Sequence, residues 1–259
     1  MPLIPCDRLL PGDLDAWERQ HRFDQLLARS PRLTRKEERA MGVIRQFFQD
    51  DPSGYVGVSW GKDSVVTAHL VWRAMGDRVP VVWVREEPHK NPFCLDVRDA
   101  FFALCPHKNY HEIVVQYSHD EMGWHATGTM ELGFKTSRQM FGDRHVSGVR
   151  GKESSIRELV MKRWGTSTDR TARPIGWWSG EDVFAYLEKH NLPVHPAYAM
   201  SMGGLHTRSR LRVCCLGGER GTMFNRRELE ETYYRPEIEA ITQEWERLTG
   251  LKAGSRWVL

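Results

Sequence analysis

Long apolar runs are missing from this chain. No stretch approaches ~18 consecutive apolar residues, which excludes a helix that spans a membrane. The first ten residues, MPLIPCDRLL, also lack the basic region and long apolar run that a secretory signal peptide requires. We therefore expect a cytoplasmic protein with no membrane partner.

Cysteine is scarce, and no two cysteines have the C-x-x-C spacing. The chain contains five cysteines in 259 residues, and an odd number without a secretion signal favours reduced thiols. A structural zinc ribbon needs paired C-x-x-C ligands, so the sequence disfavours that class as well. Cys214 and Cys215 are adjacent, which sets them apart as candidates for chemistry.

Neither sign of charge dominates the chain, but basic charge is concentrated in two segments. The formal net charge is +3, and 40% hydrophobic with 27% charged residues is typical of a globular protein. Residues 135–173 carry ten Lys/Arg against four Asp/Glu, and residues 205–227 carry six Arg against one Glu. This pattern predicts a site for a polyanion, although a solvated arginine-rich surface is the simpler alternative.

The first fifty residues have the apolar spacing of helices. A second helix is expected to begin at a Thr34 cap and to run to Gln49, after the break at Ser30. Asp13 is expected to cap the first helix. The residues expected near one face of that first helix are Leu14, Trp17, Phe23, Leu26 and Leu27.

From residue 55 onward, short β-branched runs alternate with amphipathic segments, and this alternation is typical of right-handed parallel βαβ units. We therefore predict an α/β fold, with a doubly wound, mostly parallel five-stranded sheet, N-terminal helices and a C-terminal helical extension. Such sheets bind ligands at the carboxyl ends of their strands. The expected strands are residues 55–59, 79–84, 113–117, 145–149 and 174–175, and the expected helices are residues 64–75, 91–104, 130–141, 154–162, 180–190 and 236–248.

The strongest local signal is the loop SWGKDS at residues 59–64, between an apolar strand and a helix. The N-terminus of a helix presents unpaired N–H groups and a positive dipole end, which suits phosphate. Gly61 permits close approach of an anion, while Lys62 adds a charge and is expected to be exposed. The loop is neither a Walker A motif nor a GxGxxG fingerprint, because the glycine spacing of both is absent.

Four ordered motifs make the sequence resemble the PP-loop ATP pyrophosphatases and, within them, the phosphoadenylylsulfate (PAPS) reductase family. The first is SWGKDS, and the second is GVRGKES at residues 148–154 together with Arg157. The third runs from Pro174 through Trp178 and Asp182 to Tyr186, and the fourth is LPVHPAY at residues 192–198. Together these motifs cover roughly residues 54–200.

The resemblance implies both an organisation and a reaction. Residues 51–200 are expected to form the nucleotide-binding domain, after a helical segment at residues 1–50. Residues 201–259 are expected to form an Arg- and Cys-containing extension packed on that domain. Family members bind adenine nucleotides, and many cleave ATP between the α- and β-phosphates, adenylate a substrate oxygen and release pyrophosphate. We therefore expect ATP and Mg²⁺ as cofactors and an adenylating enzyme of the sulfurtransferase type.

The same resemblance implies the residues of the site. Asp63 is the carboxylate expected to hold Mg²⁺, and the arginines would neutralise phosphate charge. For Arg150 and Glu153 the simpler interpretation is a surface ion pair. The residues expected to bind the nucleotide are Ser59, Trp60, Gly61, Lys62, Asp63, Ser64, Gly148, Arg150 and Glu153. Those expected to be catalytic are Lys62, Asp63, Arg150, Arg157 and Cys214.

The cysteine pattern departs from that of the family's reductases, because the sequence ends in GSRWVL without a Cys-Gly-Leu-His type nucleophile. This departure favours activation by ATP for sulfur transfer. Arg208, Arg210 and Arg212 precede Cys214 and would favour its thiolate, although the cysteine pair also fits a small buried hydrophobic role.

Two alternative functions remain open at this stage. One is a sulfonucleotide (PAPS or APS) reductase that uses Cys214, and the other is a non-catalytic nucleotide-binding partner subunit. Besides an adenine nucleotide, the candidate partners are a nucleic acid and a sulfur-donor protein. The oligomeric state is open, with a homodimer as one option.

Overall fold

The computed structural model describes residues 1–116, 126–208, 213–217 and 226–250. Within these ranges, no helix combines the length and the apolar character that crossing a bilayer requires. The helices are α1 (Pro11–Ala28), α2 (Pro31–Asp50), α3 (Lys62–Met75), α4 (Phe93–Leu104), α5 (Ala126–Phe141), α6 (Ser155–Trp164), α7 (Gly180–Lys189), α8 (Arg226–Tyr233) and α9 (Arg235–Thr249).

The described strands form one parallel sheet of five in the order β3-β2-β1-β4-β5. The sheet therefore matches the doubly wound α/β fold that the sequence predicts. Its register pairs Val56 with Val81 of β2 and with Val146 of β4. The strands are β1 (Tyr55–Val58), β2 (Val81–Glu87), β3 (Tyr110–Gln116), β4 (His145–Val146) and β5 (Thr171–Ala172).

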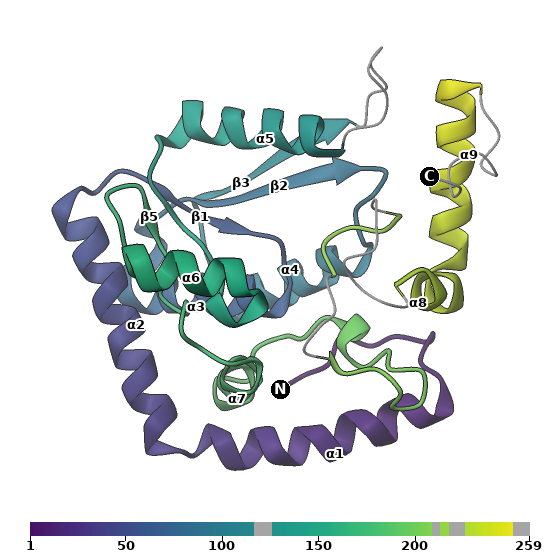
Figure 1. Cartoon of the computed structure of the whole chain (residues 1–259), viewed down its shortest axis with the longest axis horizontal. Helices are drawn as coiled ribbons and strands as arrows, with labels where there is room; N and C mark the ends of the chain where they lie inside the picture. The colour runs from purple at the N-terminus through teal and green to yellow at the C-terminus, as the bar shows by residue number, and fades with distance from the viewer. Residues whose placement is uncertain (117–125, 209–212, 218–225, 251–259) are drawn as a thin grey trace.

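Helices cover both faces of this sheet, as Figure 1 shows. Helix α5 lies along one face of β2 and β3, while α3 and α4 lie on the opposite side of the strands. The close fit of α5 depends on Gly133, where an added Cβ would lie 2.3 Å from a methyl carbon of Val84 on β2. From β1 the chain continues through β2 to β3 on one side of the sheet, and it then returns to β4 on the other side of β1. The order of the strands therefore reverses its direction beside β1. In sheets of this type, ligands bind at this point of reversal, outside the carboxyl ends of the strands.

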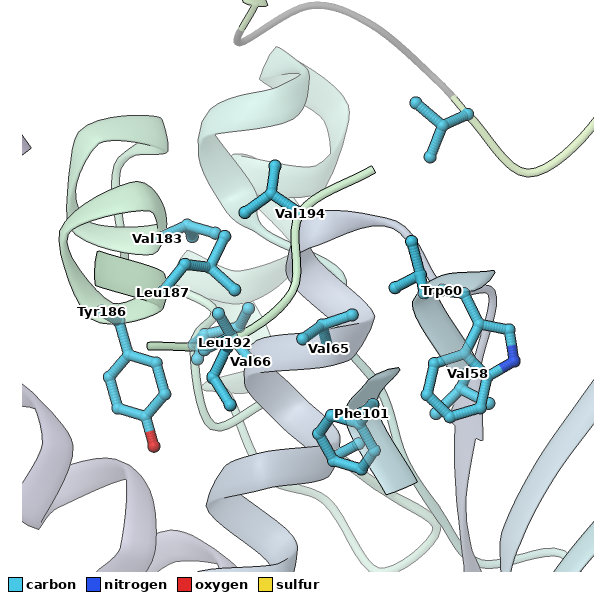
Figure 2. Close-up of a cluster of buried hydrophobic side chains, with 14 of the residues drawn as sticks. Val58, Trp60, Val65, Val66, Phe101, Val183, Tyr186, Leu187, Leu192 and Val194 are labelled. Carbon is cyan, nitrogen blue, oxygen red and sulfur yellow. The ribbon is translucent and has the colours of Figure 1, made fainter. Parts of the chain in front are cut away.

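The main hydrophobic core lies around α3 and extends to α7. Figure 2 shows Val58, Val65 and Phe101 on one side of this cluster and Val183 with Leu192 on the other. Strand β2 contributes a Val-rich run that is buried on both faces, as expected for a central parallel strand. Buried residues from Trp17 on α1 to Ile241 on α9 belong to the same cluster. The N-terminal helices and the C-terminal extension therefore share the core of the sheet.

The predicted buried face of the first helix is wrong, since Leu14, Phe23, Leu26 and Leu27 are exposed. The face that α1 buries instead consists of Asp13, Ala16, Trp17, Asp24 and Ala28. Two carboxylates can be buried there because the rest of the chain supplies their hydrogen-bond partners.

Asp13 is the clearest of these buried carboxylates. It accepts hydrogen bonds from the backbone N–H of Ser201 at 3.1 Å and of Gly203 at 2.9 Å. The hydroxyl of Tyr233 donates to it at 2.7 Å. Asp13 is not the helix cap either, since Leu10 occupies that position and donates its N–H to the carboxylate. One side chain thus joins α1 to two distant segments.

Several helix and strand boundaries also differ from those that the sequence predicts. Helix α2 is capped by Ser30, whose hydroxyl accepts from the Arg32 N–H, and Thr34 lies inside the helix. The fifth strand is Thr171–Ala172, which pairs with β4, and the strand predicted at residues 174–175 is wrong. A proline at position 174 has no N–H to donate, which disfavours it in a strand. Helix α8 was not predicted.

Candidate functional site

A cavity of about 610 Å³ lies at the carboxyl ends of β1, β2 and β4, where the sheet topology reverses. The residues that line it come from the loop after β1, the end of β2, helices α5 and α6, and residues 213–215. Of the residues that the sequence predicts for the site, those that line the cavity are Ser59, Gly61, Lys62, Asp63, Ser64, Gly148, Glu153, Arg157 and Cys214.

The loop after β1 is held in shape by its own side chains. Ser64 Oγ accepts from the backbone N–H of Ser59 at 3.1 Å and donates to the carbonyl of Gly61 at 3.0 Å. Gly61 is the N-terminal cap residue of α3 and has no side chain with which to fill the space above the helix. An added Cβ at Gly61 would lie 3.2 Å from both Tyr198 and Val213. The loop therefore leaves the N-terminus of α3 open to an anion.

Trp60 does not line the cavity, so the structure places it away from the other nucleotide-binding candidates. The residue adopts a left-handed backbone conformation with φ of 58°. This conformation directs the indole into the core, where it is fully buried and meets the rings of Trp83, Phe101 and Phe102 edge-on or tilted. The buried indole of Trp60 thus holds the loop against the core, on the side away from the cavity.

Lys62 is buried, and the expectation of an exposed lysine is wrong. Its Nζ lies 2.6 Å from Asp63 Oδ2 and 5.3 Å from the centre of the Tyr198 ring. The other oxygen of Asp63 accepts from Arg150 Nε at 2.5 Å. The Asp63 carboxylate thus lies between two cations, and both cations are close to the N-terminus of α3.

This arrangement bears on the predicted metal. Mg²⁺ in proteins takes one or two carboxylates together with phosphate oxygens and water. Here both oxygens of Asp63 already hold cationic side chains, and the described residues contain no group of three or more His, Cys, Asp or Glu arranged for a metal. In this arrangement Asp63 is an ion-pair partner and does not fit a magnesium ligand.

Arg150 is buried and does not line the cavity, so the surface ion-pair interpretation is wrong for this residue. It joins the loop after β4 to the first turn of α3 through Asp63, and its Nη1 donates to the carbonyl of Trp178 at 3.4 Å. Gly148 makes this approach possible, because a Cβ there would lie 2.9 Å from the carbonyl oxygen of Asp63. Glu153 and Arg157 form an ion pair with each other and line the cavity.

The adjacent cysteines enter the cavity from the C-terminal extension. Cys215 forms an antiparallel bridge with Lys90, and the N–H of Leu216 donates to the carbonyl of His89 at 2.7 Å. These backbone contacts hold both thiols at the end of β2, with their sulfur atoms 3.9 Å apart. The two thiols and the loop after β1 therefore share one cavity.

The arginines predicted to activate Cys214 are not all beside it. Arg208 is buried and extends toward α1, where it lies 2.5 Å from Asp24 and 3.8 Å from the centre of the Phe184 ring. Arg210 and Arg212 lie outside the described residues. The expected role of Arg208 is therefore wrong, because its charge is used to compensate a buried carboxylate.

Two residues that line the cavity were not predicted for the site. Tyr198 accepts from the backbone N–H of Lys62 at 3.0 Å and fixes the start of α3. Glu86, at the carboxyl end of β2, is only 8% exposed. The sequence signal for Glu86 is a charged residue directly after an apolar strand. Cys94, in contrast, is buried behind the loop, donates to the carbonyls of Ser59 and Val213, and burial raises the pKa of its thiol.

Solved structures similar to this chain come from several enzyme types. The U34-tRNA thiolase of Methanococcus maripaludis is 13% identical with a TM-score of 0.44, covering 82% of this chain and 78% of the thiolase. FMN adenylyltransferase of Candida glabrata in complex with ATP is 15% identical with a TM-score of 0.43, covering 74% and 69%. PAPS reductase of Candida auris is 13% identical with a TM-score of 0.42, covering 68% and 92%. At these identities the likeness concerns the fold alone.

A sequence relative is found in Escherichia phage 186, an uncharacterized 37.8 kDa protein that is 34% identical over 107 residues. The match covers 39% of this chain and 28% of the length of the phage protein. A family model, described as the phosphoadenosine phosphosulfate reductase domain, matches residues 54–209. This match spans more than half of the chain and confirms the resemblance seen in the motifs. The chain belongs to the phosphoadenosine phosphosulfate reductase domain family.

Proposed function

We propose that this protein binds ATP in the cavity, cleaves it between the α- and β-phosphates, and adenylates an acceptor for sulfur transfer. A single observation carries the proposal: the anion-binding loop at the start of α3 and the thiols of Cys214 and Cys215 line the same cavity. An enzyme that only bound a nucleotide would need the loop alone. An enzyme that moves sulfur onto an activated acceptor needs both the loop and a reactive thiol.

The loop fits the pyrophosphate portion of ATP. The N–H of Lys62 is taken by the Tyr198 hydroxyl, so an anion would bind at the N–H groups that follow it in the first turn of α3, where the helix dipole adds a partial positive charge. Lys62 lies within reach of the same space, and Arg157 lines it from α6. These groups would stabilise the negative charge that develops on the leaving pyrophosphate.

The reaction would take place in three displacements. In the first, an oxygen of the acceptor attacks the α-phosphorus, and the bond to the β-phosphate breaks with release of pyrophosphate. In the second, the outer sulfur of a persulfide on Cys214 attacks the adenylated carbon, and AMP leaves with the oxygen. In the third, the Cys215 thiolate attacks the Cys214 sulfur, which breaks the S–S bond, frees the thiolated acceptor and leaves a Cys214–Cys215 disulfide for a thiol reductant. The persulfide sulfur would come from a sulfur-donor protein.

The surface beside the cavity favours a nucleic acid as the acceptor. Arg138 and Arg157 line the cavity from α5 and α6, and Lys162 and Arg163 continue the basic charge along α6. Trp164 is 60% exposed, and the Arg163 guanidinium lies 5.0 Å from its ring centre. Basic side chains interleaved with an exposed aromatic ring suit a phosphate backbone and a stacked base.

A sulfonucleotide reductase is the second candidate, and the family match favours it. In that reaction a cysteine thiolate attacks the sulfur of PAPS or APS, and the nucleotide leaves before a thiol reductant releases sulfite. Incubation of the protein with each sulfonucleotide and reduced thioredoxin distinguishes the two functions. Sulfite release would support the reductase, and its absence would support the adenylating enzyme if pyrophosphate forms from ATP.

The cysteine variants test the sulfur-transfer step directly. Cys214→Ser should abolish incorporation of ³⁵S from a labelled persulfide donor into tRNA or DNA, while ATP binding stays at the wild-type level. Cys94→Ser serves as the matched control and should retain incorporation, because Cys94 is buried behind the loop. Full incorporation by the Cys214→Ser, Cys215→Ser double variant would show that the thiols are structural.

A further inference from the structure

Glu86 is a buried carboxyl group placed at the edge of the cavity. It belongs to β2, which lies between β1 and β3, and it lines the cavity at the carboxyl end of the strand. Its side chain is aimed into the space that the loop and the cysteines share. A carboxyl group in such a position needs an explanation, because burial of an ionised carboxylate is unfavourable unless it is paired.

Within the described parts of the chain, one oxygen of the Glu86 carboxyl group, Oε1, lacks a hydrogen-bond partner. The neighbouring Glu87 shows the contrast, since it pairs with both Arg85 and Lys90. Lys62 and Arg157, which line the same cavity, hold the carboxylates of Asp63 and Glu153.

The cysteine pair lies beside Glu86. The carbonyl of Glu86 accepts from the N–H of Lys90 at 2.9 Å, and Lys90 in turn forms the antiparallel bridge with Cys215. Burial, and after it the charge of Cys215, raises the pKa of Glu86 to about 7. Negative charges on Glu86 and Cys215 would oppose each other, so ionisation of one group disfavours ionisation of the other.

Charged groups on every side of the cavity complete this environment. They are Lys62 and Asp63 on α3, Arg85 on β2, Arg138 on α5, and Glu153 and Arg157 at α6. The other titratable groups that line it are Tyr55, His145, Tyr198, Cys214 and Cys215.

We propose that Glu86 is the catalytic base that takes the proton from Cys215 before the Cys215 thiolate attacks the Cys214 sulfur and frees the thiolated acceptor. In this step the S–H bond of Cys215 breaks and an O–H bond forms on the Glu86 carboxylate, leaving a thiolate and a neutral carboxylic acid. The net charge of the pair is unchanged, which suits a transfer inside a partly dry cavity. The proposal rests on the proposed sulfur transfer and adds to it the group that moves the proton.

The thiols of the resting full-length protein provide a test that needs neither ATP nor an acceptor. The rate at which iodoacetamide alkylates Cys215 is measured against pH in a Cys214→Ser background. Glu86→Gln should move the midpoint of this profile to lower pH, because it removes a negative charge that opposes the thiolate. Glu131→Gln removes the same charge from the exposed face of α5, outside the cavity, and should leave the midpoint in place.

A second measurement follows sulfur transfer with Cys214 present. Glu86→Gln should lower ³⁵S incorporation about 100-fold and remove its rise with pH near 7, because general-base catalysis typically contributes 10²–10⁴-fold. Glu86→Asp keeps the carboxyl group and should restore part of the rate.

The outcomes separate this proposal from the proposed function. An unchanged alkylation midpoint in a folded Glu86→Gln variant would overturn the role of Glu86, even if the protein releases pyrophosphate. If the wild-type protein releases no pyrophosphate, the proposed function fails, while a shifted midpoint would still establish the coupling of Glu86 to Cys215. Should Glu86→Gln not fold, Glu86→Met, which also removes the negative charge, provides the same midpoint comparison.

Discussion

Arg150 and Asp63 are 87 positions apart in the sequence, yet the arginine Nε lies 2.5 Å from the aspartate Oδ1. The contact fastens the loop after β4 to the first turn of α3, across the point where the sheet topology reverses. Because the Arg150 side chain is only 4% exposed, the pair is weakly screened by solvent. The geometry of the anion-binding loop depends on this contact.

Removal of Arg150 should therefore destabilise the protein strongly. Arg150→Ala leaves Asp63 with one cation and opens a buried space, and breaking a buried pair in this way costs about 3 kcal/mol or more. Lys162→Ala breaks the exposed pair with Glu158 and should cost no more than about 1 kcal/mol. Urea unfolding of both variants checks the difference, and equal losses would contradict the structural role of Arg150.

Loss of the Lys62 charge should weaken nucleotide binding, although the side chain is buried. Lys62→Met keeps the apolar stem and removes the charge, so ATP should bind about tenfold more weakly or worse. The Met variant is preferred to Ala, because the lysine stem is buried against Tyr198. Equilibrium binding of ATP measures the effect, with Lys152→Ala as a control on an exposed lysine outside the cavity. Wild-type affinity in a folded Lys62→Met protein would contradict the assignment.

Trp60 should contribute to the stability of the protein and not to nucleotide binding. Trp60→Ala removes a fully buried indole and should cost about 3–5 kcal/mol. Trp60→Phe retains an aromatic ring in the core and should bind ATP with wild-type affinity, since the side chain does not line the cavity. Thermal unfolding together with ATP titration separates the two effects. A loss of affinity in Trp60→Phe without a loss of stability would show that the indole contacts the nucleotide.

Glu37 gives the protein a pH dependence that can be measured without knowledge of its substrate. Burial alone would raise the pKa of Glu37, but hydrogen bonds from His190, Lys189 and Arg73 outweigh it and lower the pKa to about 2. A depressed carboxyl pKa stabilises the folded state above the unfolded value near 4.5, and this stabilisation is lost as pH falls toward 2.

The comparison is between the wild-type protein and Glu37→Gln. The difference in the free energy of unfolding should be constant above pH 5 and should shrink below it, with about 3 kcal/mol of the wild-type advantage lost by pH 2. A difference that does not change between pH 6 and pH 3 would show that Glu37 is not held as an ion pair.

The sequence predicts the sheet and the loop well, because both depend on local patterns. The β-branched run of β2 and the strand–loop–helix pattern at residues 55–75 need no distant partner to be recognised. The buried polar contacts could not be predicted in the same way. Arg208 pairs with Asp24 across 184 positions, and neither residue carries a local signal that it is buried.

The same limit explains the errors in the site. Lys62 follows a glycine in a loop, which indicates exposure, but Tyr198 and Arg150 approach it from distant segments and enclose it. Trp60 lies inside the loop motif, yet its left-handed backbone directs the ring away from the cavity. The sequence alone does not place Glu86 in the site, because that placement depends on the contact between Lys90 and Cys215, which brings the thiols to the end of β2.

The most direct test of the central claim is the identity of the phosphate product. The full-length protein is incubated with γ-³²P-labelled ATP, in separate arms with total tRNA and with plasmid DNA, and the products are resolved by thin-layer chromatography. Cleavage between the α- and β-phosphates predicts labelled pyrophosphate in one of these arms, with AMP or an adenylated nucleic acid. Labelled orthophosphate with ADP would contradict the account, and so would ATP that stays intact in both arms.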